Sequence, residues 1–268
     1  MDGSLLVAAA AIAMGGVIGT LQGALGAGGA ILTIPALVHG LGVPLDVATI
    51  TSLFVTCANA GVGSLHALRA GRALPRTGIA LGGIGVAGTF VGAWLHRGVD
   101  ETVVLALFSL VMLAAAALMA SQRTGADDTG LTSERVDLRR AARLVAVGSA
   151  VGLLTGFFGV GGGFLLVPAL VAALGVPMRL APGTSMVAIA LNSTWGLAAH
   201  AHGVAADATI AILFGGAGVI GVTIGGRVAR HVPDARLRQA FAGLVAGLAV
   251  FTFARDVPAL AALLTRAA

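Results

Sequence analysis

Two glycine-rich stretches carry residue types that could bind an anion. Gly26-Ala27-Gly28-Gly29 and, 133 residues later, Gly159-Val160-Gly161-Gly162-Gly163 each precede an apolar run that we expect to be helical. A helix N-terminus offers free backbone N–H groups and a partial positive charge, and glycine lets an oxyanion reach them closely. The stretches therefore predict an anion-binding cradle; tight helix packing without a ligand is the alternative. The candidate cradle residues are Gly26, Gly28, Gly29, Gly159, Gly161, Gly162 and Gly163.

Neutral hydrogen-bond donors follow both stretches inside apolar runs. They are Thr51, Ser52 and Asn59 in the first copy and Thr184, Ser185 and Asn192 in the second. Neutral donors suit an anion that must bind and then leave. Alternatively, such side chains only hydrogen-bond across helices and hold them together. We interpret these six residues as candidate substrate-binding residues.

Other reactive residue types do not form a recognisable site. Cys57 is the only cysteine, so one chain cannot build a disulfide or a cysteine-based metal site, and Cys57 is interpreted as a packing residue. His66, His200 and His202 could relay protons, but interfacial positions are the commoner explanation for such histidines. Asp46 is expected to cap the helix that follows Pro44. We therefore predict no catalytic site, no metal and no cofactor.

The glycine stretches belong to a longer internal repeat. Residues 23–44 read GALGAGGAILTIPALVHGLGVP, and residues 156–177 read GFFGVGGGFLLVPALVAALGVP. Self-similarity sets the architecture before any local assignment is made. Because the offset is about half of the chain, the repeat predicts two equivalent halves and not a solenoid.

The composition indicates a membrane protein. Hydrophobic residues make up 57% of the chain and charged residues only 10%, and the mean hydropathy is +1.00. Apolar runs of about 20 residues are long enough to cross the hydrocarbon core as helices. All 16 basic residues are arginines, and they cluster in the gaps between these runs, so the isoelectric point of about 11.4 indicates topology-setting charges and no nucleic-acid binding. The expected fold class is an all-α, polytopic helical membrane protein.

Ten apolar runs divide between the two halves. The first repeat is expected over residues 1–121, a connector over 122–140 and the second repeat over 141–268. The runs are residues 4–25, 28–43, 46–66, 77–95 and 102–121, then 141–158, 161–176, 181–200, 206–226 and 237–254, before a proline-containing tail.

The arginines predict that the two halves have opposite orientations. Arg69, Arg72 and Arg76 follow the third run of the first half, whereas the equivalent gap of the second half has no arginine. The second half carries its arginines one gap later, from Arg227 to Arg238. Since basic gaps face the cytoplasm, this pattern predicts two inverted-topology repeats of about five segments each, with both termini outside.

Inverted repeats with glycine- and proline-interrupted segments are typical of secondary transporters, whose site lies near the repeat interface. The second run of each half fits this description. From Gly28 to Gly42, a helix would be about 22 Å long, which is shorter than the roughly 30 Å core. We therefore expect the glycine-rich links to dip into the membrane.

The doubled pattern G-x-G-G, P-A-L, L-G-V-P, T-S and Asn resembles the TauE/SafE family of sulfite exporters, over nearly the whole chain. The resemblance implies a multi-pass transporter of the cell (plasma or inner) membrane that carries a small sulfur-containing anion such as sulfite or an organosulfonate, usually for export. Relatives that handle thiosulfate through membrane cysteines match less well, because Cys57 stands alone.

The leading hypothesis is therefore a secondary anion transporter, not an enzyme, that works by alternating access between its two repeats in a lipid bilayer. Protons are the candidate coupling ion. A membrane-embedded enzyme or an assembly partner without transport activity is the alternative, and a channel is a third option.

Overall fold

A computed structural model describes residues 3–26, 30–121, 138–158, 163–200 and 207–267, and every regular element in these ranges is helical. The first half contains α1 (Gly3–Leu25), α2 (Ala30–Pro35), the π-helix η2 (Ala36–Gly40), α3 (Leu45–Arg69), α4 (Pro75–His96) and α5 (Glu101–Ser121). The second half contains α6 (Leu138–Phe158), α7 (Gly163–Ala172), α8 (Ala181–His200), α9 (Ala208–Val228), the 3₁₀-helix η3 (Ala229–His231) and α10 (Asp234–Ala267).

The helices confirm the prediction of a polytopic helical membrane protein. Five helices within the described ranges are long and apolar enough to cross a membrane. They are Leu5–Leu25, Leu45–Arg69, Pro75–His96, Ala141–Phe158 and Ala208–His231. Large apolar side chains such as Trp94, Leu110, Ile212 and Val250 are more than 60% exposed. An apolar exterior of this extent suits lipid and not water.

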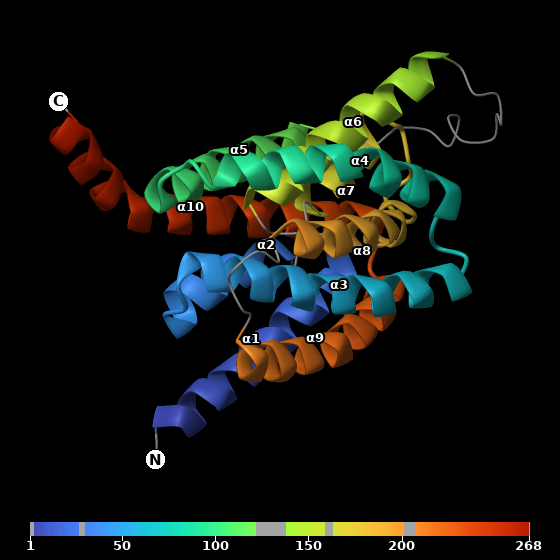
Figure 1. Ribbon diagram of the computed structural model, residues 1–268. Coiled ribbons are helices and arrows are strands. Elements are labelled where there is room, and N and C mark those ends of the chain that lie inside the picture. The colour runs from blue at the N-terminus through green and yellow to red at the C-terminus, as the bar shows by residue number, and fades with distance from the viewer. Residues whose placement is uncertain (1–2, 27–29, 122–137, 159–162, 201–206, 268) are drawn as a thin grey trace.

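Six helices pack in the order α6, α4, α8, α3, α9 and α1, and α5 packs against α10. Figure 1 shows α3 and α8 in the middle, between the α4–α6 pair and the α1–α9 pair. In the sequence repeat, α1 corresponds to α6, α3 to α8 and α4 to α9. If each helix is replaced by its counterpart, the packing order becomes α1, α9, α3, α8, α4 and α6, which is the same order read backwards. The sequence repeat is thus also a repeat in packing.

Glycine faces bring the outer pairs together. Gly19 on α1 lies against Gly218 on α9, where a Cβ atom on Gly19 would overlap the carbonyl oxygen of Gly218. At the equivalent place, Gly152 on α6 lies in the same way against Gly85 on α4. Only residues without a side chain allow two helix backbones to approach this closely. Both pairs run parallel, because their contacts advance in the same direction along the two helices.

The two central helices cross in opposite directions. Gly63 near the end of α3 lies against Met186 near the start of α8, and Gly196 near the end of α8 lies against Leu53 near the start of α3. α3 and α8, which occupy equivalent positions in the two halves, therefore run antiparallel. Figure 1 also shows that α1 begins and α10 ends at one end of the bundle, away from the α3–α4 turn.

The second element of each half is short, as expected. α2 and η2 have six and five residues and α7 has ten, so each spans about 15 Å, roughly half of the hydrocarbon core. Both end in the same Leu-Gly-Val-Pro turn. Its glycines, Gly42 and Gly175, have φ angles of 68° and 65°, which L-residues rarely adopt. The following Val43 and Val176 donate backbone hydrogen bonds of 3.0 and 2.9 Å to Leu37 and Leu170.

Three boundaries differ from the sequence predictions or fall outside the described residues. α10 continues to Ala267, so the tail after residue 254 is part of the last helix. Asp46 does not cap α3: Pro44 is the N-cap residue, without a side-chain hydrogen bond, and Asp46 lies in the first turn. Residues 122–137 of the expected connector lie outside the described ranges, and α6 begins at Leu138.

Candidate functional site

The antiparallel crossing of α3 and α8 buries polar side chains along its length, with Thr51-Ser52 and Thr184-Ser185 toward opposite ends. All six donors predicted from the sequence are at most 1% exposed. These are Thr51, Ser52, Asn59, Thr184, Ser185 and Asn192. Burying polar groups among apolar helices is costly unless each finds a hydrogen-bond partner. Their partners therefore decide which of them are available to a ligand.

Two of the six are engaged at the start of α8. The Thr184 hydroxyl donates to the carbonyl oxygen of Leu180 at 2.7 Å and accepts from the backbone N–H of Leu74 at 2.9 Å. The Ser185 hydroxyl donates to the carbonyl oxygen of Pro182 at 2.8 Å. Thr184 thus joins α8 to the start of α4, which is the packing alternative considered for it.

The other predicted donors keep unpaired atoms among the described residues. The Thr51 and Ser52 hydroxyls and both side-chain atoms of Asn192 have no hydrogen-bond partner there. The hydroxyls of Thr49, Thr56 and Ser193 share this state. Native proteins leave few buried polar groups unpaired. The α3–α8 crossing is therefore where water or a polar ligand is needed.

Gln22 is a polar residue of this region that sequence reasoning missed. It is 1% exposed on α1, and its Oε1 accepts a 3.2 Å hydrogen bond from Asn59 Nδ2. Its Nε2 and Asn59 Oδ1 have no partner among the described residues. The sequence did contain a signal for this residue, because a glutamine inside an apolar run indicates a buried polar contact. The repeat concealed it, because Thr155 stands at the equivalent position.

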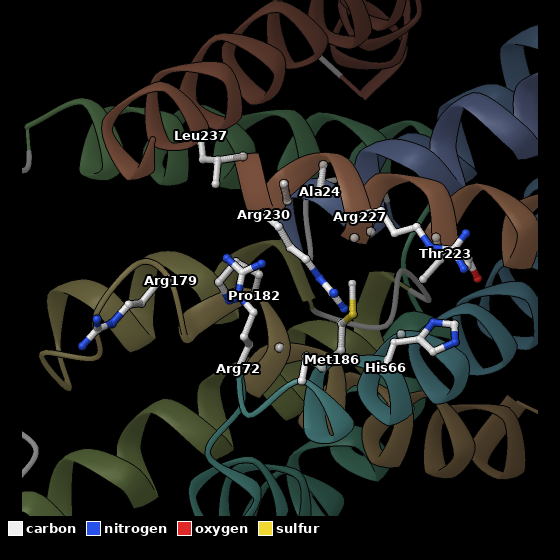
Figure 2. Close-up of a pocket in the computed structure, with 18 of the residues that line it drawn as sticks. Ala24, His66, Arg72, Arg179, Pro182, Met186, Thr223, Arg227, Arg230 and Leu237 are labelled. Carbon is white, nitrogen blue, oxygen red and sulfur yellow. The ribbon is translucent and has the colours of Figure 1, made fainter. Parts of the chain in front are cut away.

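A cavity of about 300 Å³ opens beside this polar region, at the end of the bundle that holds the α3–α4 turn. Its floor includes Gly23, Gly63 and Met186, which are next to or one helical turn from Gln22, Asn59 and Ser185. Five arginines and a histidine line it: His66, Arg69, Arg72, Arg179, Arg227 and Arg230. The lining residues that the structure describes include no aspartate or glutamate. Figure 2 shows the basic side chains around the cavity.

The family model described as sulfite exporter TauE/SafE matches residues 11–252. The chain belongs to the TauE/SafE family. It is 32% identical over 257 residues to a "probable membrane transporter protein" of Xylella fastidiosa strain 9a5c, covering 94% of this chain and 97% of the relative. It is 29% identical over 202 residues to the "probable membrane transporter protein MJ0441" of Methanocaldococcus jannaschii, covering 73% of each chain. No solved structure matches it significantly. This TauE/SafE protein is thus a multi-pass membrane protein of a transporter family.

The glycine-rich links of this TauE/SafE chain are described only at their edges. Gly28, Gly29, Gly159, Gly161 and Gly162 lie outside the described residues, and Gly163 is the first residue of α7. Gly26 has a φ angle of 78°. A Cβ atom there would lie 2.6 Å from Pro182 Cα and 3.0 Å from Ser185 Oγ. The first link therefore leaves α1 directly against the start of α8.

At the opposite end of the TauE/SafE bundle, some positions equivalent to cavity residues carry larger or acidic side chains. Phe157 takes the place of Ala24, and its ring lies edge-on to His96 with a centroid distance of 6.2 Å. His96 Nε2 is 4.0 Å from an Asp46 carboxylate oxygen. Arg97 Nη2 donates to the carbonyl oxygen of Ala199 at 3.5 Å. Of the three candidate histidines, His66 lies in the cavity wall, and the side chains of His200 and His202 fall outside the described set.

Cys57 lies near the midpoint of the crossing. Its Sγ is 3.2 Å from Thr194 Oγ1 and 3.9 Å from the carbonyl oxygen of Ala190, its counterpart in the repeat. Thr194 Oγ1 already donates to the carbonyl oxygen of Ala190 at 2.8 Å. The thiol therefore fills space beside a satisfied hydroxyl.

We expect Cys57→Ala to keep transport within about twofold of the wild type, at a stability loss of roughly 1 kcal/mol for the small void it leaves. Initial flux in proteoliposomes and the melting temperature in detergent measure the two effects. Cys57→Ser, which retains a polar atom of similar size, is the matched control. Complete loss of flux in a folded Cys57→Ala protein would instead point to thiol chemistry.

Proposed function

We propose that this chain is a secondary transporter of a small anion. The observation that carries the proposal is the arginine-lined cavity, whose floor residues adjoin the buried Gln22 and Asn59, each with a side-chain atom that has no partner among the described residues. Guanidinium groups attract oxyanions, while neutral hydroxyls and amides bind them weakly enough for release. A cationic entrance that leads to a neutral binding site suits a protein that binds an anion and then releases it on the other side.

The proposed substrate is sulfite or an organosulfonate, and the proposed direction is export. The family description, sulfite exporter, supports the substrate class. The residues proposed to contact the anion are those predicted from the sequence, with Gln22 added. In the present state Asn192, Thr51 and Ser52 have no side-chain hydrogen-bond partner among the described residues. Thr184 and Ser185 would need to rearrange to take part. Protons remain the proposed coupling ion.

The proposed mechanism is alternating access between inverted repeats, residues 1–121 and 141–268, joined by a cytoplasmic connector at 122–140. The antiparallel α3–α8 pair, the palindromic packing order and the repeated Leu-Gly-Val-Pro turn support the inversion. The mechanism needs two states that expose the site to opposite sides. A cavity that opens at one end of the bundle, as seen here, is what one of those states requires.

Counterflow in proteoliposomes tests the function directly. Vesicles loaded with unlabelled sulfite should transiently accumulate labelled sulfite above equilibrium, and taurine or sulfoacetate should replace it if organosulfonates are carried. A channel would equilibrate the label without overshoot. The absence of counterflow for every sulfur oxyanion, with protein correctly inserted, would reject the proposal.

Topology gives a separate prediction. Arg72 and Arg230 line one cavity, and α10 ends at the other end of the bundle. Since basic segments stay in the cytoplasm, Arg72→Cys and Arg230→Cys in a Cys57→Ala background should resist an impermeant thiol reagent on intact cells and react in everted vesicles. Ala267→Cys should show the opposite pattern, because the proposed topology puts the end of α10 on the outer face of the cell membrane. Labelling of the two arginine positions on opposite sides would contradict the inversion.

A further inference from the structure

The arginines that line the cavity include two, one from each half of the chain, whose positions are not explained by membrane orientation alone. Arg72 comes from the α3–α4 turn of the first half, and Arg230 from η3 of the second half. Figure 2 shows both side chains extending into the cavity from opposite walls, Arg230 toward Met186, whereas Arg179 points away from them. Orientation needs arginines on one side of the membrane, but it does not need two guanidinium groups that extend into one cavity.

Two cations that share one cavity repel each other unless an anion lies near them. No carboxylate lies among the described residues that line the cavity, so Arg72 and Arg230 have no acidic counterion in its wall. An oxyanion placed between them would relieve the repulsion and could accept charge-assisted hydrogen bonds from both. The floor below is built from small or apolar residues such as Gly63, Met186 and Val222 and does not compete for the anion.

The two ends of the bundle differ in charge at equivalent positions. Arg179 corresponds to Asp46, and Arg227 corresponds to Trp94. Arg230 has a basic counterpart in Arg97, whose guanidinium donates to the carbonyl oxygen of Ala199. An anion therefore meets an attractive field at the cavity end and a carboxylate at the other end. A cleft lined by one sign of charge raises the local concentration of the opposite ion and its association rate.

From these observations we infer that Arg72 and Arg230 form a docking site for an oxyanion, distinct from the buried α3–α8 site, that captures the substrate before it passes Met186. The inference rests on the proposed anion transport and adds that the two sides of the membrane differ in their apparent affinity for the substrate. Substrate is bound at lower concentration from the arginine end than from the opposite end. Arg227 contributes to the field, because it lines the same cavity.

Sulfite transport measured from each side tests the docking site. In right-side-out and everted vesicles, wild-type KM should be about tenfold lower from the arginine end at low salt, and raising the salt to about 0.5 M should remove most of the difference. Arg72→Gln together with Arg230→Gln should raise KM about tenfold from that end only, with kcat little changed. A KM that is equal from both sides, or that the double substitution leaves unchanged, would overturn the inference.

Arg143→Gln is the matched control. Arg143 is an exposed arginine near the start of α6, which runs parallel to α4 and so begins at the same end of the bundle, but it does not line the cavity. Loss of the same charge there should leave KM within about twofold of the wild type. If Arg143→Gln acts as strongly as the double substitution, general surface charge explains the effect and no docking site exists.

Direct binding separates this inference from the transport proposal. Sulfite should bind the detergent-solubilised wild type and Arg143→Gln, and binding should weaken about tenfold in the Arg72→Gln, Arg230→Gln variant even if no flux is detected. A lipid phosphate presents the same oxyanion chemistry, so reconstitution with and without phosphatidylglycerol forms a second arm. If phosphatidylglycerol abolishes the effect of the double substitution, a headgroup occupies the cavity and the docking role for substrate is wrong.

Discussion

Gly19→Ala is expected to destabilise the protein by about 3 kcal/mol, near the upper end of the usual cost of overpacking. The added Cβ atom would lie 2.6 Å from the Cα atom of Gly218 and would overlap its carbonyl oxygen. A backbone cannot rotate away as a side chain can, so α1 and α9 would have to separate along their whole contact. For a chain of this size, that loss corresponds to a melting temperature roughly 6 to 12 °C lower in detergent.

Gly16→Ala provides the comparison on the same helix, because a Cβ atom on Gly16 would meet no atom within 4 Å. Alanine is also the better helix former by up to about 1 kcal/mol, so Gly16→Ala should be neutral or slightly stabilising. Gly152→Ala, the repeat counterpart of Gly19, should be as damaging as Gly19→Ala. Equal melting temperatures for Gly16→Ala and Gly19→Ala would mean that α1 and α9 do not pack as closely as described.

The sequence was sufficient to predict the helices and the repeat. Apolar runs of membrane-spanning length coincide with the helices, because in a bilayer every backbone polar group must be satisfied within its own segment. The Leu-Gly-Val-Pro turn was also readable, since only glycine takes the φ angle required at Gly42 and Gly175. Local chemistry determines both features, so they follow from short stretches of sequence.

The cavity was not predictable in the same way. Arg72 and Arg230 lie in gaps between apolar runs, where topology already explains an arginine. They line one cavity because α3 packs against α9, and contacts between helices far apart in the sequence cannot be inferred from the gaps that contain the arginines. Gln22 was missed for a related reason. Its hydrogen bond with Asn59 joins α1 to α3, and a contact between two helices cannot be predicted from the sequence around either residue.

The hydrogen-bond partners of the predicted donors could not be predicted from the sequence either. Thr51-Ser52 and Thr184-Ser185 are identical pairs in the sequence, yet Thr184 is occupied by the N–H of Leu74 and Thr51 has no partner among the described residues. The counterpart of Leu74 is Asp207, whose own carboxylate accepts a 3.0 Å hydrogen bond from the N–H of Ile210 and caps α9. The two copies of the motif therefore differ in the partners of a single hydroxyl, which the identical sequence pairs do not reveal.

Asn192→Leu is expected to reduce sulfite affinity and flux by roughly tenfold to a hundredfold, the worth of one hydrogen bond to a charged group. Its amide is fully buried, and neither of its side-chain atoms has a partner among the described residues. Removing an unpaired buried polar group in favour of an apolar one of similar size is neutral or stabilising. The melting temperature should therefore stay at or above that of the wild type while flux falls, which is the opposite of what loss of a structural hydrogen bond would produce.

Thr252→Val is the matched control, since Thr252 is equally buried but its hydroxyl donates to the carbonyl oxygen of Leu248 at 2.6 Å, within α10. That substitution should leave flux within about twofold of the wild type. Asn59→Leu should reduce flux as Asn192→Leu does, but it should also lower the melting temperature, because it removes the partner of Gln22 and leaves that amide buried without a hydrogen bond. If Asn192→Leu lowers stability and keeps normal flux, Asn192 holds helices together and the anion path does not pass it.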